Sequence, residues 1–477
     1  MAGPLGHLVP VPDTIAWTPA RGSRRGPPTE DDTAEAMKDH RPPVTHHRPG
    51  AASRGVGAPS TDASRSDGHP LAAPTPKVTV VGIGADGWAG LPERLRRIVL
   101  DAGAVVGGRR HLTMLPDLPG QRRETWPSPL REGLPALLAS LEGVPTVVLA
   151  SGDPLVSGIG TTLIDLLGAD AVRVEPAVSS VALARARMGW PAERCTVVGL
   201  VGRDPRLLLP HLAPGHRVLV LSSDRHTPGT VAALLAGAGY GASRMTVLGD
   251  LGSDSESRSQ TTADDWLTSP PEEVPALHVL ALELSGPPAN GPTPGLADDA
   301  FEHDGQLTKR DLRASALARL APSPGRHLWD VGAGSGSVGI EWMRAHPTCT
   351  ATAVEAHAER AERIGRNAGR LGVPGLRVVT GRAPDALAGL PAPDAVFVGG
   401  GATRPGVLDA CLEALGPGGR LLVHGVTLET EHLLADAYRR HGGELTRIAV
   451  ETAAPLGTFT GWTPARTVTQ WFLRVDH

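Results

Sequence analysis

The amino-acid sequence predicts an α/β protein built from two consecutive domains. Three observations predict this class. Short apolar runs alternate with helical stretches, a proline- and glycine-rich segment interrupts this series, and a glycine-rich loop follows the first apolar run on each side of that segment. Apolar runs separated by helices are typical of mostly parallel sheets covered by helices. The length of 477 residues leaves room for two or three domains.

Composition narrows the class of protein. The formal net charge is -4, so the chain lacks the basic domain that is typical of nucleic-acid binding. The three cysteines, Cys195, Cys349 and Cys411, are far apart and form no CxxC pair, which favours a reducing cytoplasm over a disulfide framework or a zinc site. No apolar run approaches the roughly 18–20 residues of a membrane span. We therefore expect a cytoplasmic protein without a metal site and without a membrane or nucleic-acid partner.

Residues 1–76 are predicted to form a disordered N-terminal extension. They are rich in Pro, Gly, Ser, Arg and His, and Trp17 is their only aromatic residue. Such a segment buries too little apolar surface to offset the entropy lost on ordering.

The first predicted domain spans residues 77–284. Predicted buried strands cover residues 77–81, 146–150, 217–221 and 278–282. A glycine loop with Gly82 and Gly84 follows the first of them, and Ser151-Gly152-Asp153-Pro154 follows the second. Taken alone, both loops can be simple turns, and Asp153 before a proline can be a helix N-cap.

The second predicted domain spans residues 305–477 and follows a linker at 285–304. The segment SGPPANGPTPGL within this linker has the composition of a loop. A helix is predicted next, with Leu312, Ala316, Leu317 and Leu320 on one face. Predicted strands then cover residues 328–331, 351–355, 377–380, 395–398, 420–424 and 469–475.

A glycine loop and an acidic residue in the second domain predict a nucleoside-binding site. The sequence Asp330-Val331-Gly332-Ala333-Gly334-Ser335-Gly336 joins a strand to a helix, and glycines there allow a ligand to approach backbone amides. Glu355 ends the next strand, where a carboxylate can accept hydrogen bonds from both ribose hydroxyls. These features fit NAD as well as S-adenosylmethionine. Asp330, two residues before the first glycine, and Gly416-Pro417-Gly418-Gly419 favour a methyltransferase.

Residues 305–477 resemble the decarboxylating precorrin methyltransferase family (CbiT type). The resemblance rests on LTKRDLRASALARL, LWDVGAGSGSVGIEW, VVTGRAPDAL, PDAVFVGGGA and LGPGGRLLVHGVTLET. It implies a Rossmann-like seven-stranded, class I methyltransferase fold. The cofactor residues that it implies, together with the acid named above, are Thr308, Asp330, Gly332, Gly334, Gly336, Glu355 and Ala383. The acceptor side that it implies includes Lys309, Arg310, Arg313, Gly400, Arg404 and His424, although Arg310 and Arg313 fit a solvated helix face as well.

Residues 77–284 resemble the two-lobed tetrapyrrole methylases, the class III methyltransferases, and most specifically the CbiE type. The matching segments are VGIG, VVGGRRHL, SGDPLVSGIG, PAVSSVALARARMGW and LSSDRHTPGTVAALL. The sequence departs from the family pattern at residues 85–88 and 199–203. The resemblance implies a cofactor folded into a cleft between two lobes. The cofactor residues that it implies are Gly82, Gly84, Gly152, Asp153, Ser179 and Ser180. The loop Arg109-Arg110-His111 can hold acceptor carboxylates or form an ordinary basic surface.

Fusion of these domains in this order resembles the precorrin-6Y C(5,15)-methyltransferase (decarboxylating) family. The resemblance implies a bifunctional enzyme of cobalamin (corrin) biosynthesis with two S-adenosyl-L-methionine sites, a tetrapyrrole substrate and a homo-oligomeric state. Arg310, Arg404 and His424 would then be catalytic, the arginines by gripping carboxylates and His424 as a proton donor. Three alternatives remain open at this point: the same folds acting on RNA, an NAD-dependent dehydrogenase, and a scaffold without catalysis.

Overall fold

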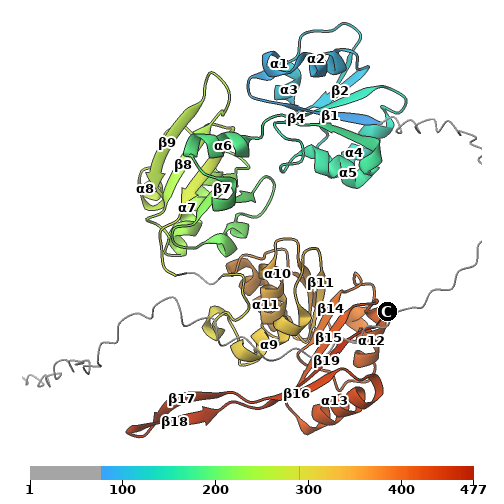
Figure 1. Ribbon diagram of the computed structural model, residues 1–477, viewed down its shortest axis with the longest axis vertical. Coiled ribbons are helices and arrows are strands. Elements are labelled where there is room, and N and C mark those ends of the chain that lie inside the picture. Colours follow the sequence, from blue (N-terminus) through green and yellow to red (C-terminus); the bar gives the residue numbers. More distant parts are fainter. Residues whose placement is uncertain (1–76, 289–290, 477) are drawn as a thin grey trace, which may run out of the picture. The chain divides into compact units, whose positions relative to one another are not determined.

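The computed structural model describes residues 77–288 and 291–476 and shows three α/β sheets and one separate hairpin (Figure 1). The predicted disordered extension, residues 1–76, lies outside the described residues. The predicted α/β class, with two sheets in the first domain and a seven-stranded sheet in the second, is confirmed.

The first sheet has the strand order β3-β2-β4-β1-β5, and all of its strands are parallel. We call this sheet and its helices the first lobe. Its strands are β1 (Val78–Ile83), β2 (Ala104–Gly107), β3 (Arg122–Thr125), β4 (Thr146–Ser151) and β5 (Val172–Glu175). The central strands are continuous runs of buried apolar residues, as expected for a parallel sheet that is covered on both faces.

Helices cover both faces of this sheet, and each face has its own core. One core contains side chains of α2 and α3, and the other contains side chains of α4 and α5. The helices are α1 (Gly87–Gly90), α2 (Glu93–Leu100), α3 (Arg109–Thr113), α4 (Leu130–Ala139) and α5 (Ile159–Leu167). This arrangement leaves the carboxyl ends of the strands free to form a site.

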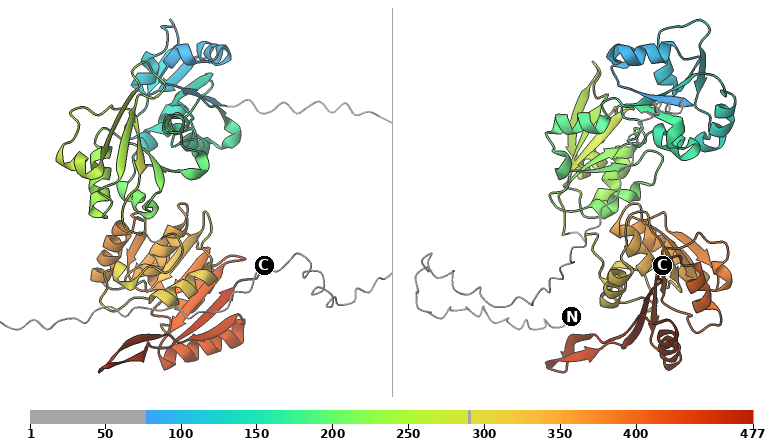
Figure 2. Two further views of the ribbon diagram at one scale, coloured as in Figure 1. Left: turned by 60° about the vertical axis from the view of Figure 1, so that its left-hand side comes forward. Right: turned by 45° about the vertical axis from the view of Figure 1, so that its right-hand side comes forward.

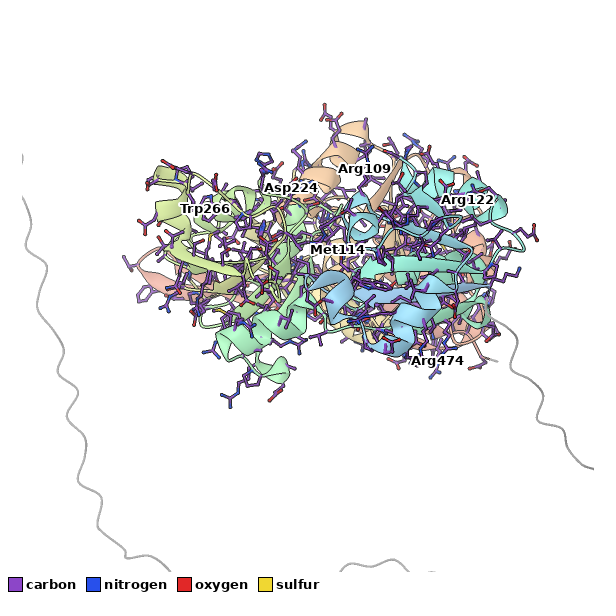
Figure 3. The ribbon with its side chains drawn as sticks, turned by 90° about the horizontal axis from the view of Figure 1, so that it is seen from above. Arg109, Met114, Arg122, Asp224, Trp266 and Arg474 are labelled. Atoms are coloured by element: carbon purple, nitrogen blue, oxygen red, sulfur yellow. The ribbon has the colours of Figure 1, made fainter. Side chains whose placement is uncertain are left out.

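The second sheet has the order β6-β7-β10-β8-β9, and with its helices it forms the second lobe. Figure 3 labels Arg122 in the first lobe and Trp266 in the second. The strands are β6 (Thr196–Gly199), β7 (Arg217–Leu221), β8 (Arg244–Gly249), β9 (Ser257–Thr262) and β10 (His278–Glu283). The helices are α6 (Ser180–Met188), α7 (Thr227–Gly237) and α8 (Ala263–Thr268).

The expectation of a mostly parallel sheet is wrong for the second lobe. Only β6 and β7 pair in parallel, whereas β10 is antiparallel to both of its neighbours and β8 is antiparallel to β9. Strands β8 and β9 form a direct hairpin, and β9 is polar and mostly exposed. A polar strand without apolar alternation carries no periodic signal in the sequence.

The third sheet has seven strands in the order β13-β12-β11-β14-β15-β19-β16. The five strands from β13 to β15 are parallel, and β19 pairs antiparallel with β15 and β16. The strands are β11 (His327–Val331), β12 (Thr350–Glu355), β13 (Arg377–Thr380), β14 (Ala395–Val398), β15 (Arg420–Gly425), β16 (Glu444–Ile448) and β19 (Val468–Arg474).

Helices α9 (Arg310–Leu320), α10 (Ser337–Ala345) and α11 (Ala358–Arg370) pack on one face of this sheet. Helices α12 (Val407–Ala414) and α13 (Leu428–His441) pack on the other face. The predicted apolar face of α9 is confirmed, because all four of its residues, Leu312, Ala316, Leu317 and Leu320, are buried.

Two segments lie outside this regular layering. The hairpin of β17 (Glu451–Leu456) and β18 (Phe459–Pro464) extends away from the sheet in every view (Figures 1 and 2). Within the predicted linker, Leu296 and Phe301 are both 3% exposed and belong to the core beneath α9 and α10. Part of the loop-like segment therefore packs with the C-terminal domain.

Candidate functional site

A pocket of about 840 Å³ lies at the carboxyl ends of the parallel strands of the third sheet. Residues that end or follow β11, β12, β13, β14 and β15 all contribute to its wall. Ligands of open α/β sheets bind at this edge, next to the position where the strand order reverses. We call this hollow the C-terminal pocket. Its wall includes nine of the predicted residues: Thr308, Lys309, Gly332, Gly334, Glu355, Ala383, Gly400, Arg404 and His424.

The glycine loop of this pocket requires glycine for two physical reasons. Gly332, Gly334 and Gly336 all have positive φ angles, at 66°, 60° and 76°. A Cβ at Gly332 would lie 2.5 Å from the carbonyl oxygen of Gly400, and one at Gly334 would lie 2.8 Å from that of Gln306. The loop therefore forms a cradle of backbone that a ligand can approach closely.

Glu355 is the fixed acid of the pocket. Its side chain is 4% exposed and accepts hydrogen bonds from the Gly334 amide at 2.8 Å and the His357 amide at 3.0 Å. Both carboxylate oxygens are therefore oriented by backbone, and each keeps a lone pair for a further donor. This chemistry fits a diol such as the ribose of a nucleoside, so the residues present fit the predicted S-adenosyl group.

Asp330 and Gly336 do not line the pocket wall. They contact residues behind the glycine loop and so support it. Asp330 is 1% exposed and accepts a hydrogen bond from the Gly339 amide at 2.9 Å. Burial raises the pKa of Asp330 to about 7, and the negative charge of Glu355 adds to this effect. A Cβ at Gly336 would lie 2.7 Å from Ile364, so this glycine permits helix packing. Direct contact of either residue with a ligand stays a prediction.

His424 lies in the pocket wall in a buried environment. It is 8% exposed, packs edge-on against Phe397 and hydrogen-bonds through Nε2 to Gln470 Oε1 at 3.0 Å. Because an amide oxygen only accepts, Nε2 carries the proton in this arrangement. Burial lowers the pKa of His424 to about 4. A neutral imidazole predominates at neutral pH, which weighs against the expected role as a proton donor.

The expectation that Arg313 lies on the acceptor side is wrong. Arg313 is 0% exposed, and its Nε donates to Glu341 Oε1 at 2.6 Å. Its other nitrogens donate to the carbonyl oxygens of Leu296 and Thr308. Arg313 is the fourth residue of α9, and at this position the side chain points into the protein interior. The same helix turn leaves Arg310 exposed, outside the C-terminal pocket, beside an adjoining hollow of about 490 Å³.

A smaller pocket, of about 90 Å³, lies between the two lobes of the N-terminal domain. Its wall contains the predicted residues Gly84, Gly152 and Ser180, which follow the carboxyl ends of β1, β4 and β5. It also contains Arg110 and apolar side chains from the second lobe. We call this hollow the inter-lobe pocket. The predicted loop Arg109-Arg110-His111 is a helix, since all three residues belong to α3.

Three other predicted residues of this domain have local structural roles. A Cβ at Gly82 would lie 2.0 Å from the carbonyl oxygen of Gly152, so glycine permits these two loops to touch. Asp153 accepts a hydrogen bond from the Leu155 amide at 2.9 Å, which forms a turn before α5 and is no helix cap. Ser179 is the N-cap of α6 and accepts from the Ala182 amide at 3.1 Å. Contact of these three with a cofactor stays a prediction.

Comparison with known proteins decides the family. A model described as tetrapyrrole (corrin/porphyrin) methylases matches residues 77–266, and one described as precorrin methyltransferase domain matches residues 299–475. A Sinorhizobium sp. protein named precorrin-6Y C(5,15)-methyltransferase [decarboxylating] is 47% identical over 400 residues, which are 83% of this chain and 96% of that protein. The chain belongs to this family.

Two further relatives agree with this membership. The Mycobacterium tuberculosis protein of the same name is 45% identical over 394 residues, 83% of this chain and 98% of that protein. A Salmonella typhimurium protein named cobalt-precorrin-6B C(15)-methyltransferase (decarboxylating) is 33% identical over 156 residues, 32% of this chain and 80% of that protein. Membership of the precorrin-6Y methyltransferase family favours neither of two earlier alternatives, a methyltransferase that acts on RNA and an NAD-dependent dehydrogenase.

Several wall residues of this precorrin-6Y methyltransferase family member were not predicted. Arg382 follows β13 and Arg466 follows β18, and both line the C-terminal pocket. The position of Arg382 after a predicted strand could have indicated it, because carboxyl ends of parallel strands share one edge. Arg466 depends on the β17–β18 hairpin, which the sequence did not predict. In the inter-lobe pocket, His278 was placed in a strand but not at a site.

None of the helices in residues 77–288 and 291–476 is long and apolar enough to cross a membrane.

Proposed function

We propose that this chain is a bifunctional enzyme of cobalamin biosynthesis that binds S-adenosyl-L-methionine at two separate sites. The N-terminal domain methylates carbon 5 of precorrin-6Y at the inter-lobe pocket. The C-terminal domain methylates carbon 15 and removes carbon dioxide from the acetate of ring C at the C-terminal pocket. A homo-oligomeric state and a cytoplasmic location stay predictions.

One observation supports this division most directly: a chain of this family has two distinct pockets, each at the carboxyl ends of parallel strands and each with a glycine loop. When bound, S-adenosyl-L-methionine supplies a methyl group on a positively charged sulfur. The electron-rich bridging carbons of a tetrapyrrole are themselves nucleophiles, so the protein needs to position the reactants more than to activate them.

In the C-terminal pocket, positioning of the nucleoside falls to backbone and one acid. The Gly332 and Gly334 cradle admits a ligand against the amides, and Glu355 accepts from the ribose hydroxyls with both oxygens already oriented. Preoriented groups lose little entropy on binding, which favours a single pose of the donor.

Basic side chains around the same pocket suit the peripheral carboxylates of the acceptor. Lys309 and Arg466 line both the C-terminal pocket and the adjoining hollow, where Arg310 also lies. Arg404 has only a surface pair with Asp385 at 3.4 Å, with side chains 42% and 80% exposed, so that pair contributes little. These cations hold carboxylates by charge-assisted hydrogen bonds.

Loss of carbon dioxide has a different requirement from carboxylate binding. Carbon dioxide leaves more readily from a poorly solvated carboxylate, so the reacting acetate belongs at the buried part of the wall, away from the arginines. His424, which lines the pocket, is 8% exposed and packs against the buried Phe397, is such a part. The electron pair of the broken carbon–carbon bond passes into the conjugated macrocycle, and the methyl group left on ring C takes its proton from water. His424, neutral at physiological pH, would orient the acceptor rather than deliver a proton.

Mass spectrometry of the product made from precorrin-6Y tests this proposal. The wild-type chain should add two methyl groups and release one carbon dioxide. Glu355→Ala should still add the methyl group at carbon 5, whereas carbon 15 methylation and decarboxylation should require at least about tenfold more S-adenosyl-L-methionine, because two charge-assisted hydrogen bonds are lost.

Glu359→Ala is the matched control, because Glu359 is an exposed acid in the first turn of α11 and lies outside the pocket wall. It should behave as wild type. Equal loss of both methylations in a folded Glu355→Ala protein would contradict the assignment of two sites with separate reactions.

A further inference from the structure

His278 combines burial with an unused hydrogen-bonding atom. It is the first residue of β10, is 7% exposed and lies in the wall of the inter-lobe pocket. Its Nδ1 lies 2.7 Å from the carbonyl oxygen of Pro275. Its Nε2 is buried and has no hydrogen-bond partner among the described residues. An unpaired polar atom in such a place costs free energy unless a ligand pairs with it.

The partner of Nδ1 decides what Nε2 can do. A carbonyl oxygen only accepts, so Nδ1 carries the proton and the neutral ring presents a lone pair at Nε2. Burial lowers the pKa of His278, which favours the neutral ring further. Nε2 is therefore an acceptor on a residue of the pocket wall, and it requires an N–H or O–H donor.

The residues around His278 indicate which kind of ligand donates the hydrogen bond to Nε2. Leu183, Leu248 and Leu251 give the pocket wall an apolar lining, which suits a flat ring better than a solvated carboxylate. The acids that act on the His278 ring are Asp224, labelled in the second lobe in Figure 3, and Asp250. A ligand carboxylate beside Nε2 would be repelled by the lone pair of that atom.

We propose that Nε2 of His278 accepts a hydrogen bond from the exocyclic amino group of adenine and thereby positions the methyl donor in the inter-lobe pocket. The proposal rests on the proposed function of this domain. Gly84, Gly152 and Ser180 line the same hollow, whose volume of about 90 Å³ takes only part of a ligand. Adenine is the part of the donor that combines an apolar face with an amino group at its edge.

Two inhibitors that differ at this group test the proposal. S-adenosylhomocysteine carries the amino group, and S-inosylhomocysteine carries a carbonyl oxygen in its place. In the full wild-type chain, the adenosyl compound should inhibit carbon 5 methylation more strongly. His278→Leu should raise the inhibition constant of the adenosyl compound about three- to tenfold, which corresponds to the loss of one hydrogen bond. The same change should leave the inhibition constant of the inosyl compound unchanged, so the difference between the two inhibitors should disappear.

His278→Gln should restore inhibition by the adenosyl compound, because its amide oxygen again offers an acceptor. His216→Leu is the matched control in the same lobe, since both His216 nitrogens have partners, the His211 carbonyl at 2.8 Å and Thr196 Oγ1 at 3.0 Å, and His216 is absent from the pocket wall. It should keep the wild-type ratio.

An unchanged ratio of the two inhibition constants in His278→Leu overturns the inference, including when both constants rise together. If the wild-type chain itself does not methylate carbon 5, the proposed function of the domain fails, which is a separate result. The ratio is independent of the fraction of folded protein, so partial unfolding of a variant does not obscure it.

Discussion

Two buried side chains of the C-terminal domain titrate in opposite directions. Burial raises the pKa of Asp330 to about 7 and lowers the pKa of His424 to about 4. Below neutrality, folding therefore favours a protonated Asp330 and an unprotonated His424. Stability from the neutral His424 is lost as pH falls from about 6.5 toward 4, while the penalty of an ionised Asp330 grows as pH rises from about 4 toward 7.

Because the two trends oppose each other, we expect the wild-type free energy of unfolding of this domain to change little between pH 4.5 and 6.5. Each residue alone contributes a slope of at most about 1.4 kcal/mol per pH unit. Asp330→Asn should leave a free energy of unfolding that rises with pH, and His424→Gln should leave one that falls with pH. Hydrogen exchange of peptides from β11 and β15, measured in both variants across this range, checks the signs. If the free energy of unfolding changed with pH in the same direction in both variants, the opposite pKa shifts of Asp330 and His424 would be refuted.

At the scale of elements, one buried ion pair connects α9, α10 and the segment before them. Arg313 of α9 pairs with Glu341 of α10, and the same carboxylate accepts from the amides of Gly295 and Leu296 at 2.6 and 3.1 Å. The side chains are 0% and 2% exposed. Since Thr308 and Lys309 precede α9 and line the C-terminal pocket, this network also positions the pocket wall.

Arg313→Met should lower the free energy of unfolding of the C-terminal domain by about 3–5 kcal/mol, because it leaves Glu341 buried without its cation. Combining it with Glu341→Leu should cost less than the sum of the single changes, since the pair would be removed together. Arg310→Met, an exposed change one turn earlier in α9, should stay within about 0.5 kcal/mol of wild type. Urea unfolding of the wild type, the two single variants, the double variant and Arg310→Met gives these values, and strict additivity would contradict the network.

The same elements show how far sequence reasoning reaches. Strands Arg217–Leu221, Arg377–Thr380 and Ala395–Val398 have the predicted bounds, because buried apolar runs between polar ends are a strong local signal. The polar strand Ser257–Thr262 and the β17–β18 hairpin carry no such signal and were missed. The antiparallel direction of β10 was missed for another reason: strand direction depends on pairing, which an apolar run does not encode.

For the candidate site, too, the local patterns were predicted and the tertiary contacts were not. The glycines and Glu355 were found because a strand, a tight turn and an acid at a strand end form a local pattern. The burial of Arg313 depends on Glu341, 28 residues away, and the open acceptor atom of His278 depends on Pro275 and on the packing of both lobes. Such pairings are set by tertiary structure, so residue type and spacing alone did not separate a buried arginine from a ligand-binding one.

At the scale of the whole molecule, the two pockets that we propose as ligand sites are formed in different ways. In the N-terminal domain the pocket lies between two lobes, each with its own sheet. In the C-terminal domain it lies at one edge of a single seven-stranded sheet. The two pockets share no residue, so we expect each to bind the nucleoside independently.

Calorimetric titration of the full chain with S-adenosylhomocysteine tests this claim most directly. We predict two molecules bound per wild-type chain, and one tightly bound molecule per chain in Glu355→Ala, with the remaining site unchanged in affinity. A wild-type stoichiometry of one or none, or displacement of the nucleoside by NAD, would contradict the presence of two methyl-donor sites.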